Sequence, residues 1–118
     1  MGQSARTVLI VDDCRDLADS LQMLLAGWGY DVTVAYSGEE ALDLLRMIAF
    51  DVLISDIEMP GMTGIELADA VKLYRVPVKR FVAISGSSAQ LAAATAHFDL
   101  CVPKPVRPGV LEATLRGL

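Results

Sequence analysis

The stretch that decides the fold is residues 51–64, DVLISDIEMPGMTG. It opens with an apolar run, Val52-Leu53-Ile54, and runs into a Met59-Pro60-Gly61 turn. An apolar run that is bounded by a turn is typical of a strand buried on both faces of a parallel sheet. Asp56 and Glu58 lie between the run and the turn, yet carboxylates are rarely buried unless something pairs with them. The rest of the chain is therefore expected to supply a partner for these acids.

The same apolar pattern recurs along the chain, each time followed by a segment of helical periodicity. The runs are Val8 to Val11, Val32 to Tyr36, Val52 to Ile54, Phe81 to Ile84 and Leu100 to Val102. Apolar strands separated by helices predict an α/β fold, an open parallel sheet covered by helices on both faces. A closed (β/α)8 barrel would need about twice this length.

Start and stop signals place the helices between these runs. The first helix is expected to end near Gly27 and Gly29, where glycine can take the left-handed cap. The second starts with a capping-box pattern, Ser37-Gly38-Glu39-Glu40. The others are expected from Gly64 to about Tyr74, from Ser88 to His97, and from Arg107-Pro108 onward.

Size and composition limit the class of protein. The chain has 118 residues, 53% apolar and 21% charged, which predicts one folded domain over residues 1–118. Its net charge of -5 argues against nucleic-acid binding through a basic face. Because no apolar stretch approaches the ~20 residues that span a bilayer and no signal peptide is evident, we expect no membrane association and a cytoplasmic location.

Polar side chains follow the apolar runs at the point where each predicted strand ends. Asp12 and Asp13 follow the first run, Asp56 the third, Ser85 the fourth and Lys104 the fifth. Because the carboxyl ends of parallel strands share one edge of an open sheet, and such folds bind ligands there, these side chains are expected to converge on one site.

Three carboxylates at one edge need a compensating charge. Two carboxylates ~4 Å apart repel by about 4 kcal/mol at an effective dielectric near 20, so either one is protonated or a cation lies among them. Carboxylates with open coordination positions suit Mg²⁺. With Lys104 and the Ser85 hydroxyl beside them, they form the parts of a phosphoryl site in which Asp56 is the nucleophile and becomes an aspartyl phosphate.

Four motifs in this order, VLIVDDC, DVLISDIEMPGMTG, FVAISG and VPKP, make the chain resemble the receiver domain of response regulators in two-component and phosphorelay systems. The resemblance covers essentially the whole chain. It implies the flavodoxin-like (βα)5 three-layer sandwich with strand order 2-1-3-4-5, which places the first and third strands side by side. It implies signal transduction by a phosphoprotein, not a conventional enzyme, with self-catalysed phosphoryl transfer and autodephosphorylation.

The resemblance also implies a partner and a metal. Asp56 would accept a phosphoryl group from a phosphohistidine on a histidine kinase or a histidine phosphotransfer protein. Asp12 and Asp13 would hold Mg²⁺, and Asp56 and the backbone carbonyl of Glu58 would complete the protein's share of the ligands.

The remaining implied roles concern the switch. Lys104 would contact a phosphoryl oxygen and precede a cis bond to Pro105. Ser85 would be the switch hydroxyl, and the fourth helix, fifth strand and fifth helix would form the face read by a downstream partner or output domain.

Two features depart from the family pattern. Cys101 stands where the family carries an aromatic residue or sometimes a histidine, so the usual aromatic rotation does not carry over. The segment from Ser85 to Lys104 is short, and its helix is nearly uncharged. Glu58 occupies a variable position, where its side chain is expected to alter the dephosphorylation rate.

Two other functions fit part of the pattern. Cys101 and the short fourth helix suit a receiver used as a phosphorylation-independent interaction module. Asp56-Ile57-Glu58 faintly resembles the nucleophile motif of haloacid-dehalogenase-like phosphatases, although that family places its nucleophile after the first strand and its acid pair later. For Asp12 and Asp13 the simpler alternative is an N-cap pair, and both roles can coexist.

Overall fold

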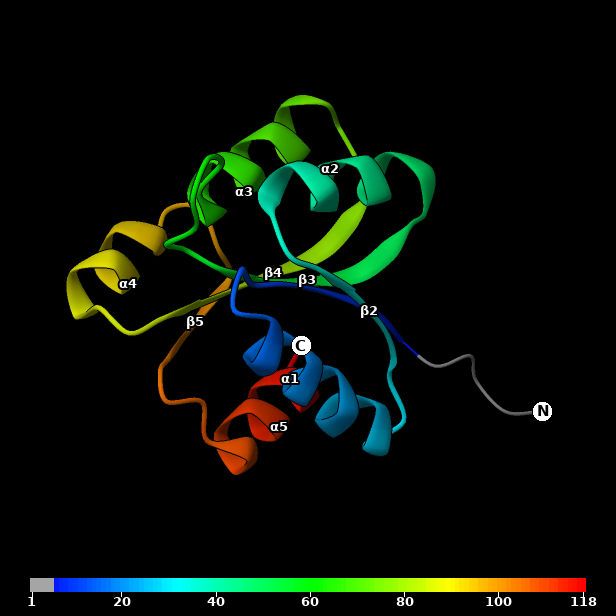
Figure 1. Cartoon of the computed structure of the whole chain (residues 1–118), viewed down its shortest axis with the longest axis vertical. Coiled ribbons are helices and arrows are strands. Elements are labelled where there is room, and N and C mark those ends of the chain that lie inside the picture. Colours follow the sequence, from blue (N-terminus) through cyan, green and yellow to red (C-terminus); the bar gives the residue numbers. More distant parts are fainter. Residues whose placement is uncertain (1–5) are drawn as a thin grey trace.

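The computed structural model describes residues 6–118, which form one five-stranded parallel sheet of order β2-β1-β3-β4-β5 (Figure 1). The strands are β1 Thr7–Val11, β2 Asp31–Ala35, β3 Phe50–Asp56, β4 Val78–Ser85 and β5 Leu100–Pro103. The predicted fold class and strand order are confirmed. β5 is an edge strand, so Pro103 sits where a missing N–H does not break a ladder.

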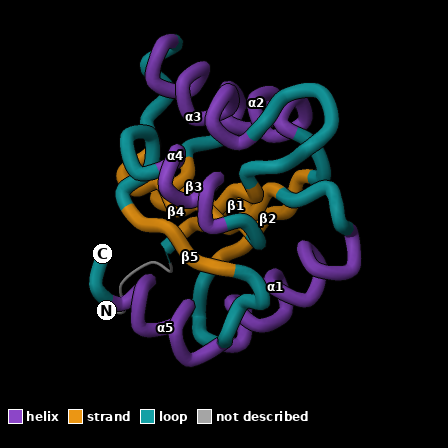
Figure 2. The backbone as a smooth tube through the Cα atoms, turned by 90° about the vertical axis from the view of Figure 1, so that its left-hand side faces the viewer, coloured by secondary structure: helices purple, strands orange, loops and turns teal. Residues whose placement is uncertain are grey.

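Helices cover both faces of the sheet. They are α1 Arg15–Gly27, α2 Gly38–Met47, α3 Gly64–Leu73, α4 Ser88–Ala94 and α5 Pro108–Arg116. α1 and α5 lie on one face, whereas α2, α3 and α4 lie on the other (Figures 1 and 2). None of the helices within residues 6–118 has the length and apolar character that crossing a bilayer requires.

Two cores, one on each face, explain why the strands are apolar throughout. Val8 and Ile10 of β1 pack with α1 and α5, whereas Leu9 and Val11 pack with α2 and α3. All four side chains are at most 1% exposed. Because side chains alternate between faces, a strand covered on both sides must be apolar at every position.

The central strands are longer than the apolar runs predicted. β3 continues two residues past Ile54 to Asp56, and Asp56 pairs with Ile84 of β4. β4 begins three residues before Phe81, at Val78, which pairs with Phe50. Pairing with neighbouring strands extends both strands through polar residues that carry no apolar signal.

The helix ends also differ in detail. α4 ends at Ala94, not at His97, because the Thr95 hydroxyl and N–H both turn back to the Ala92 carbonyl. The capping box predicted for α2 is half formed. Ser37 accepts from the Glu40 N–H, but the Glu40 carboxylate accepts from the Tyr36 N–H.

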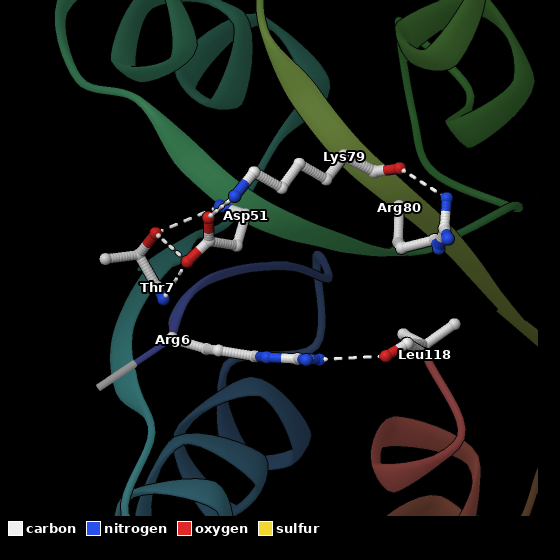
Figure 3. A network of polar contacts seen from close by, with 6 residues as sticks. All are labelled: Arg6, Thr7, Asp51, Lys79, Arg80 and Leu118. Carbon is white, nitrogen blue, oxygen red and sulfur yellow. Dashed lines mark hydrogen bonds and ion pairs between the residues drawn. The ribbon is translucent and has the colours of Figure 1, made fainter. Parts of the chain in front are cut away.

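The amino edge of the sheet is joined by a polar network (Figure 3). The Asp51 carboxylate of β3 accepts the Thr7 backbone N–H at 3.0 Å and lies 3.4 Å from Lys79 Nζ. The Thr7 N–H, followed by Lys79, lowers the pKa of Asp51 despite partial burial. This end of the sheet is therefore held by charge-assisted bonds across β1, β3 and β4.

Candidate functional site

Sheet register brings the three predicted acids together. Asp12 follows β1 directly and Asp56 ends β3, and these strands pair through Val11 and Ser55. One carboxylate oxygen from each of Asp12, Asp13 and Asp56 lies within 4.8 Å of the others. Asp12 is 2% exposed and Asp56 6% exposed, so two of the three acids are buried.

Lys104 is the partner that the buried acids require. Its Nζ lies 3.2 Å from Asp56 Oδ2 and 3.3 Å from Asp12 Oδ2. Its backbone N–H donates to the Ser85 carbonyl at 2.8 Å, which ties the end of β5 to β4. The predicted cis bond between Lys104 and Pro105 is confirmed.

One lysine does not neutralise this group of carboxylates. Burial, with the Asp12 charge as the second cause, raises the pKa of Asp56, although Lys104 opposes the change. Burial alone would lower the pKa of Lys104, but the charges of Asp12 and Asp56 outweigh it and raise that pKa. The effect of Asp12 on Asp56 and the raised pKa of Lys104 describe a site with an excess of negative charge, which a second cation would relieve.

The second carboxylate oxygen of Asp12 fits a hard metal ion. Asp12 Oδ1 accepts the Cys14 N–H at 3.0 Å, so this acid does support the first turn of α1. Asp12 Oδ2 is buried and accepts no hydrogen bond from residues 6–118, although Lys104 stands within ion-pair distance. A buried, unsatisfied carboxylate oxygen beside two further carboxylates is the donor set that Mg²⁺ accepts.

Ser85 ends β4 beside this group and is 1% exposed. Its Oγ accepts the Ser87 N–H at 3.1 Å, which closes the turn leading to α4. A movement of the Ser85 hydroxyl would therefore break a bond that holds the loop before α4.

Glu58 is placed differently from the acids. Its side chain is exposed and does not belong to the carboxylate cluster. It lines a cavity of about 430 Å³ between the loop after β3 and α4, with Met59, Thr63 and Gln90 among its walls. The side chain is thus available to a ligand or partner that enters beside the site.

Gly64, the last residue of the stretch 51–64, allows α3 to begin against the end of β3. A Cβ at this position would lie 2.2 Å from the backbone oxygen of Asp56. The Gly64 N–H donates to the Ile57 carbonyl at 2.9 Å, so α3 begins directly against the end of β3. Gly64 therefore lets the loop fold tightly enough to hold Asp56 at the rim.

Cys101 is packed rather than reactive. It pairs with Ala83 in the sheet, and its Sγ lies 3.8 Å from the Leu91 carbonyl of α4. Burial raises the pKa of its thiol, which disfavours the nucleophilic thiolate.

Sequence reasoning missed a side-chain contact between α1 and the residue that follows β2. The Tyr36 hydroxyl, just past β2, donates to Asp19 Oδ1 at 2.6 Å, and the Arg15 guanidinium lies 4.1 Å from the centre of its ring. Tyr36 is the last residue of the second predicted apolar run, whereas β2 ends at Ala35, so the Tyr36 hydroxyl was not considered as a polar group after a strand.

The strand order of this α/β sandwich defines a flavodoxin-like domain. The acidic cluster bridged by Lys104 lies at the carboxyl edge, where such folds bind ligands. The sequence profile of the response regulator receiver domain matches residues 8–116. The chain belongs to the response regulator receiver domain family of two-component systems.

Individual relatives agree with this assignment. The transcriptional regulatory protein ZraR of Escherichia coli (strain K12) is 34% identical over 111 residues, which cover 92% of this chain and 25% of ZraR. The chain thus spans about a quarter of the length of that curated relative.

Solved structures show the same fold. A CheY-like receiver domain from Methylobacillus flagellatus superposes with a TM-score of 0.86 at 29% identity, covering 97% of this chain and 98% of that one. Response regulator TrrA from Thermotoga maritima, solved in complex with Mg²⁺ and BeF, gives a TM-score of 0.86 at 26% identity, with 95% and 97% covered.

Proposed function

We propose that Asp56 accepts a phosphoryl group from a phosphohistidine on a histidine kinase or a histidine phosphotransfer protein. The observation that carries the proposal is Lys104 Nζ, placed 3.2 Å from Asp56 and 3.3 Å from the otherwise unsatisfied oxygen of Asp12. A nucleophilic carboxylate, a fixed cation and a free metal ligand meet there, which are the parts that phosphoryl transfer needs.

The transfer exchanges one bond for another. An Asp56 carboxylate oxygen forms a bond to phosphorus, while the bond from phosphorus to the donor's imidazole nitrogen breaks and the nitrogen keeps the electron pair. Lys104 then moves its charge from the Asp56 carboxylate to a phosphoryl oxygen. Buried Asp56 is shielded from bulk water, which suits a phosphoryl group that is lost slowly.

Asp12, Asp13, Asp56 and the backbone carbonyl of Glu58 are proposed to hold Mg²⁺. When bound, the metal would neutralise the charge on the phosphoryl oxygens. Mg²⁺ has support in the donor set of this chain and in the Mg²⁺ complex of the similar Thermotoga protein.

The proposed switch runs from Ser85 to the face of α4, β5 and α5. The Ser85 hydroxyl would leave the Ser87 N–H for the phosphoryl group and release the loop before α4. A groove of about 290 Å³ on that face, lined by residues that include Val102, Arg107 and Val110, is a candidate contact for the downstream partner. Phosphorylation would shift a pre-existing equilibrium between the two loop positions.

The remaining expectations are part of the same proposal. We propose that residues 1–118 are one folding unit and that the protein works in the cytoplasm. Two rival functions remain as outcomes of the tests, namely a module that never takes up phosphate and a phosphatase that turns over a phosphomonoester.

Phosphorylation is tested by incubation with acetyl phosphate, with and without Mg²⁺, followed by intact mass. Wild type is expected to gain one phosphoryl group only with Mg²⁺, and Asp56→Asn none. Asp43→Asn, on the exposed face of α2, is the matched control and should behave as wild type. An adduct of equal yield on Asp56→Asn would disprove the assignment.

The switch is tested by amide chemical shifts on addition of beryllofluoride and Mg²⁺. Changes are expected from Ser85 through α4. Cys101 stands where the family carries an aromatic residue, so Cys101→Tyr is compared with wild type. The tyrosine is expected to enlarge the chemical-shift changes in β5. Equal changes in both proteins would show that Cys101 does not limit the switch.

A further inference from the structure

A second surface lies at the amino edge of the sheet, away from the acidic site. α2 and α3 run side by side over the sheet (Figures 1 and 2), and both begin at the carboxyl edge and end at the amino edge. α3 starts against Asp56 at Gly64 and is ten residues long, which is ~15 Å at 1.5 Å per residue. The ends of these helices are therefore remote from Asp56.

Exposed apolar side chains gather at these two helix ends. Of the seven large apolar side chains recorded as exposed within residues 6–118, four lie here. Met47 is 81% exposed and Ile48 48% exposed at the end of α2, and Leu73 is 75% and Tyr74 56% exposed at the end of α3. Single exposed apolar residues are ordinary, but a cluster of them marks an interaction site.

Cations flank this apolar cluster. The Arg46 guanidinium lies 4.7 Å from the centre of the Tyr74 ring, which joins the end of α2 to the end of α3. Arg75 follows Tyr74 and is exposed. Neither arginine has a carboxylate within salt-bridge distance in the part of the chain that the structure describes. We call these six residues, Arg46, Met47, Ile48, Leu73, Tyr74 and Arg75, the amino-edge face.

The local charge opposes that of the whole chain. The net charge is -5, yet residues 72–80, KLYRVPVKR, hold four basic and no acidic residues. The nearby acids on α3 and β3 are occupied. Asp69 pairs with His97 at 2.7 Å. Asp51 pairs with Lys79 at 3.4 Å, as Figure 3 shows. Asp43 lies one turn before Met47 in α2. Within residues 6–118 it has no cation within salt-bridge distance.

We propose that the amino-edge face docks an acidic amphipathic segment of a partner protein, independently of phosphorylation at Asp56. Met47, Leu73 and Tyr74 would cover the apolar side of that segment, and Arg46 and Arg75 would pair with its carboxylates. A protein segment fits better than a lipid surface. Lys72 donates to the His97 carbonyl, Lys79 pairs with Asp51 and Arg80 donates to the Lys79 carbonyl. Two arginines, Arg46 and Arg75, are left for a ligand, whereas lipid recognition by charge uses clusters of 4–8 basic residues. The proposal does not rest on the function proposed for Asp56.

The test uses a synthetic helical peptide of about three turns, ~11 residues, with leucines on one face and glutamates on the other. It is titrated into the isotope-labelled full chain while amide shifts are recorded. Shifts are expected at the ends of α2 and α3. Asp56→Asn should bind equally well, and a peptide with lysines in place of the glutamates should not bind.

Matched variants separate docking from folding. Leu73→Ser is expected to weaken the affinity about tenfold. Met23→Ser, at 77% exposure on α1, removes an equally exposed apolar side chain from the other layer and should change nothing. Arg75→Glu should abolish binding, whereas Arg116→Glu on α5 should not. Circular dichroism spectra would establish that all four variants are folded.

Three results would overturn the proposal. The first is no shift at about 1 mM peptide, a concentration that detects even weak complexes. The second is an equal loss of affinity in Leu73→Ser and Met23→Ser. The third is binding of the same face to phosphatidylglycerol vesicles with an affinity that competes with the peptide, which would identify a membrane contact instead.

Discussion

At the scale of single residues, the site is a buried group of like charges held in place by one lysine. Asp56 is 6% exposed, and its pKa is raised by burial and by the Asp12 charge. An acid whose pKa is higher in the folded than in the unfolded protein favours folding while it is protonated. That contribution is complete below the unfolded pKa and is lost as the pH rises through the folded pKa.

Asp56→Asn is therefore expected to stabilise the metal-free protein at pH 7 by about 1–2 kcal/mol, because an ionised carboxylate leaves the buried group. The gain should shrink as the pH falls through the raised folded pKa of Asp56 and should vanish below the unfolded pKa of 3.8, where Asp56 is protonated in both states. Urea unfolding curves in a chelator, recorded from pH 3.5 to 8, measure this difference. A variant less stable than wild type at pH 7 would mean that Lys104 already compensates the charge of Asp56.

Asp51 is expected to behave in the opposite way. Its pKa is lowered by the Thr7 N–H and by Lys79, so its contribution is present above the unfolded pKa of 3.8 and is lost as the pH falls through the folded pKa. Asp51→Asn should remove part of the acid-induced unfolding of this edge of the sheet, measured in the same pH series. The two acids thus give opposite slopes of stability against pH, which distinguishes them.

At the scale of elements, α1 and α3 end in the same hydrogen-bonded turn with different residues. Gly29 donates to Ala26 and Tyr30 to Leu25 after α1, and Arg75 donates to Lys72 and Val76 to Val71 after α3. The turn needs a left-handed residue, with φ 97° at Gly29 and φ 57° at Arg75. Glycine takes this conformation freely, whereas a side chain makes it about 1–2 kcal/mol less favourable.

Exchanging the residue types at these two turns gives a matched prediction. Arg75→Gly should stabilise the protein by about 1 kcal/mol, and Gly29→Ala should destabilise it by about the same amount. A Cβ at Gly29 meets no atom within 4 Å, so backbone conformation alone is tested there. The melting temperatures of the two variants should move in opposite directions. A change in the same direction would contradict the inference that both helices end in the same left-handed turn.

The junction of β3 with α3 tolerates no side chain. A Cβ at Gly64 would clash with the Asp56 oxygen at 2.2 Å, so Gly64→Ala should lower stability by more than about 3 kcal/mol or prevent folding. Gly109→Ala in α5, where a Cβ meets nothing within 4 Å, is the control and should be neutral or mildly stabilising. Soluble yield and urea unfolding would distinguish the two variants.

At the scale of the whole molecule, metal binding and folding are linked. A metal that binds only the folded site stabilises it by about 2.7 kcal/mol when its concentration is 100 times its Kd. Mg²⁺ is expected to raise the melting temperature of wild type, and Asp12→Asn, which loses a negatively charged ligand, should lose most of that gain. Exposed Asp16→Asn is the control. Equal stabilisation of all three proteins would exclude a site at Asp12.

Much of the fold was predictable because parallel strands buried on both faces leave a clear signal. The apolar runs located all five strands, and the polar residues after them located the site edge. Less was predictable where pairing with a neighbouring strand places polar residues in a strand. Lys79 and Arg80 belong to β4 because Val78 and Arg80 pair with β3, a contact between segments far apart in sequence. The Arg46 contact with Tyr74 likewise joins helices that sequence reasoning treated separately.

The sequence by itself determined the alternation of strands and helices, the edge that carries the acids and the turn at Met59-Pro60-Gly61, where Gly61 takes a φ of 73°. Each of these depends on local periodicity or on one residue's conformational freedom. The tertiary structure decided the interactions of those residues. Lys104 reaches both Asp12 and Asp56, the Asp12 oxygen beside it accepts no hydrogen bond from residues 6–118, and the amino-edge face gathers apolar side chains from two helices. Burial and distance set the strength of a charge interaction, and both depend on how the elements pack.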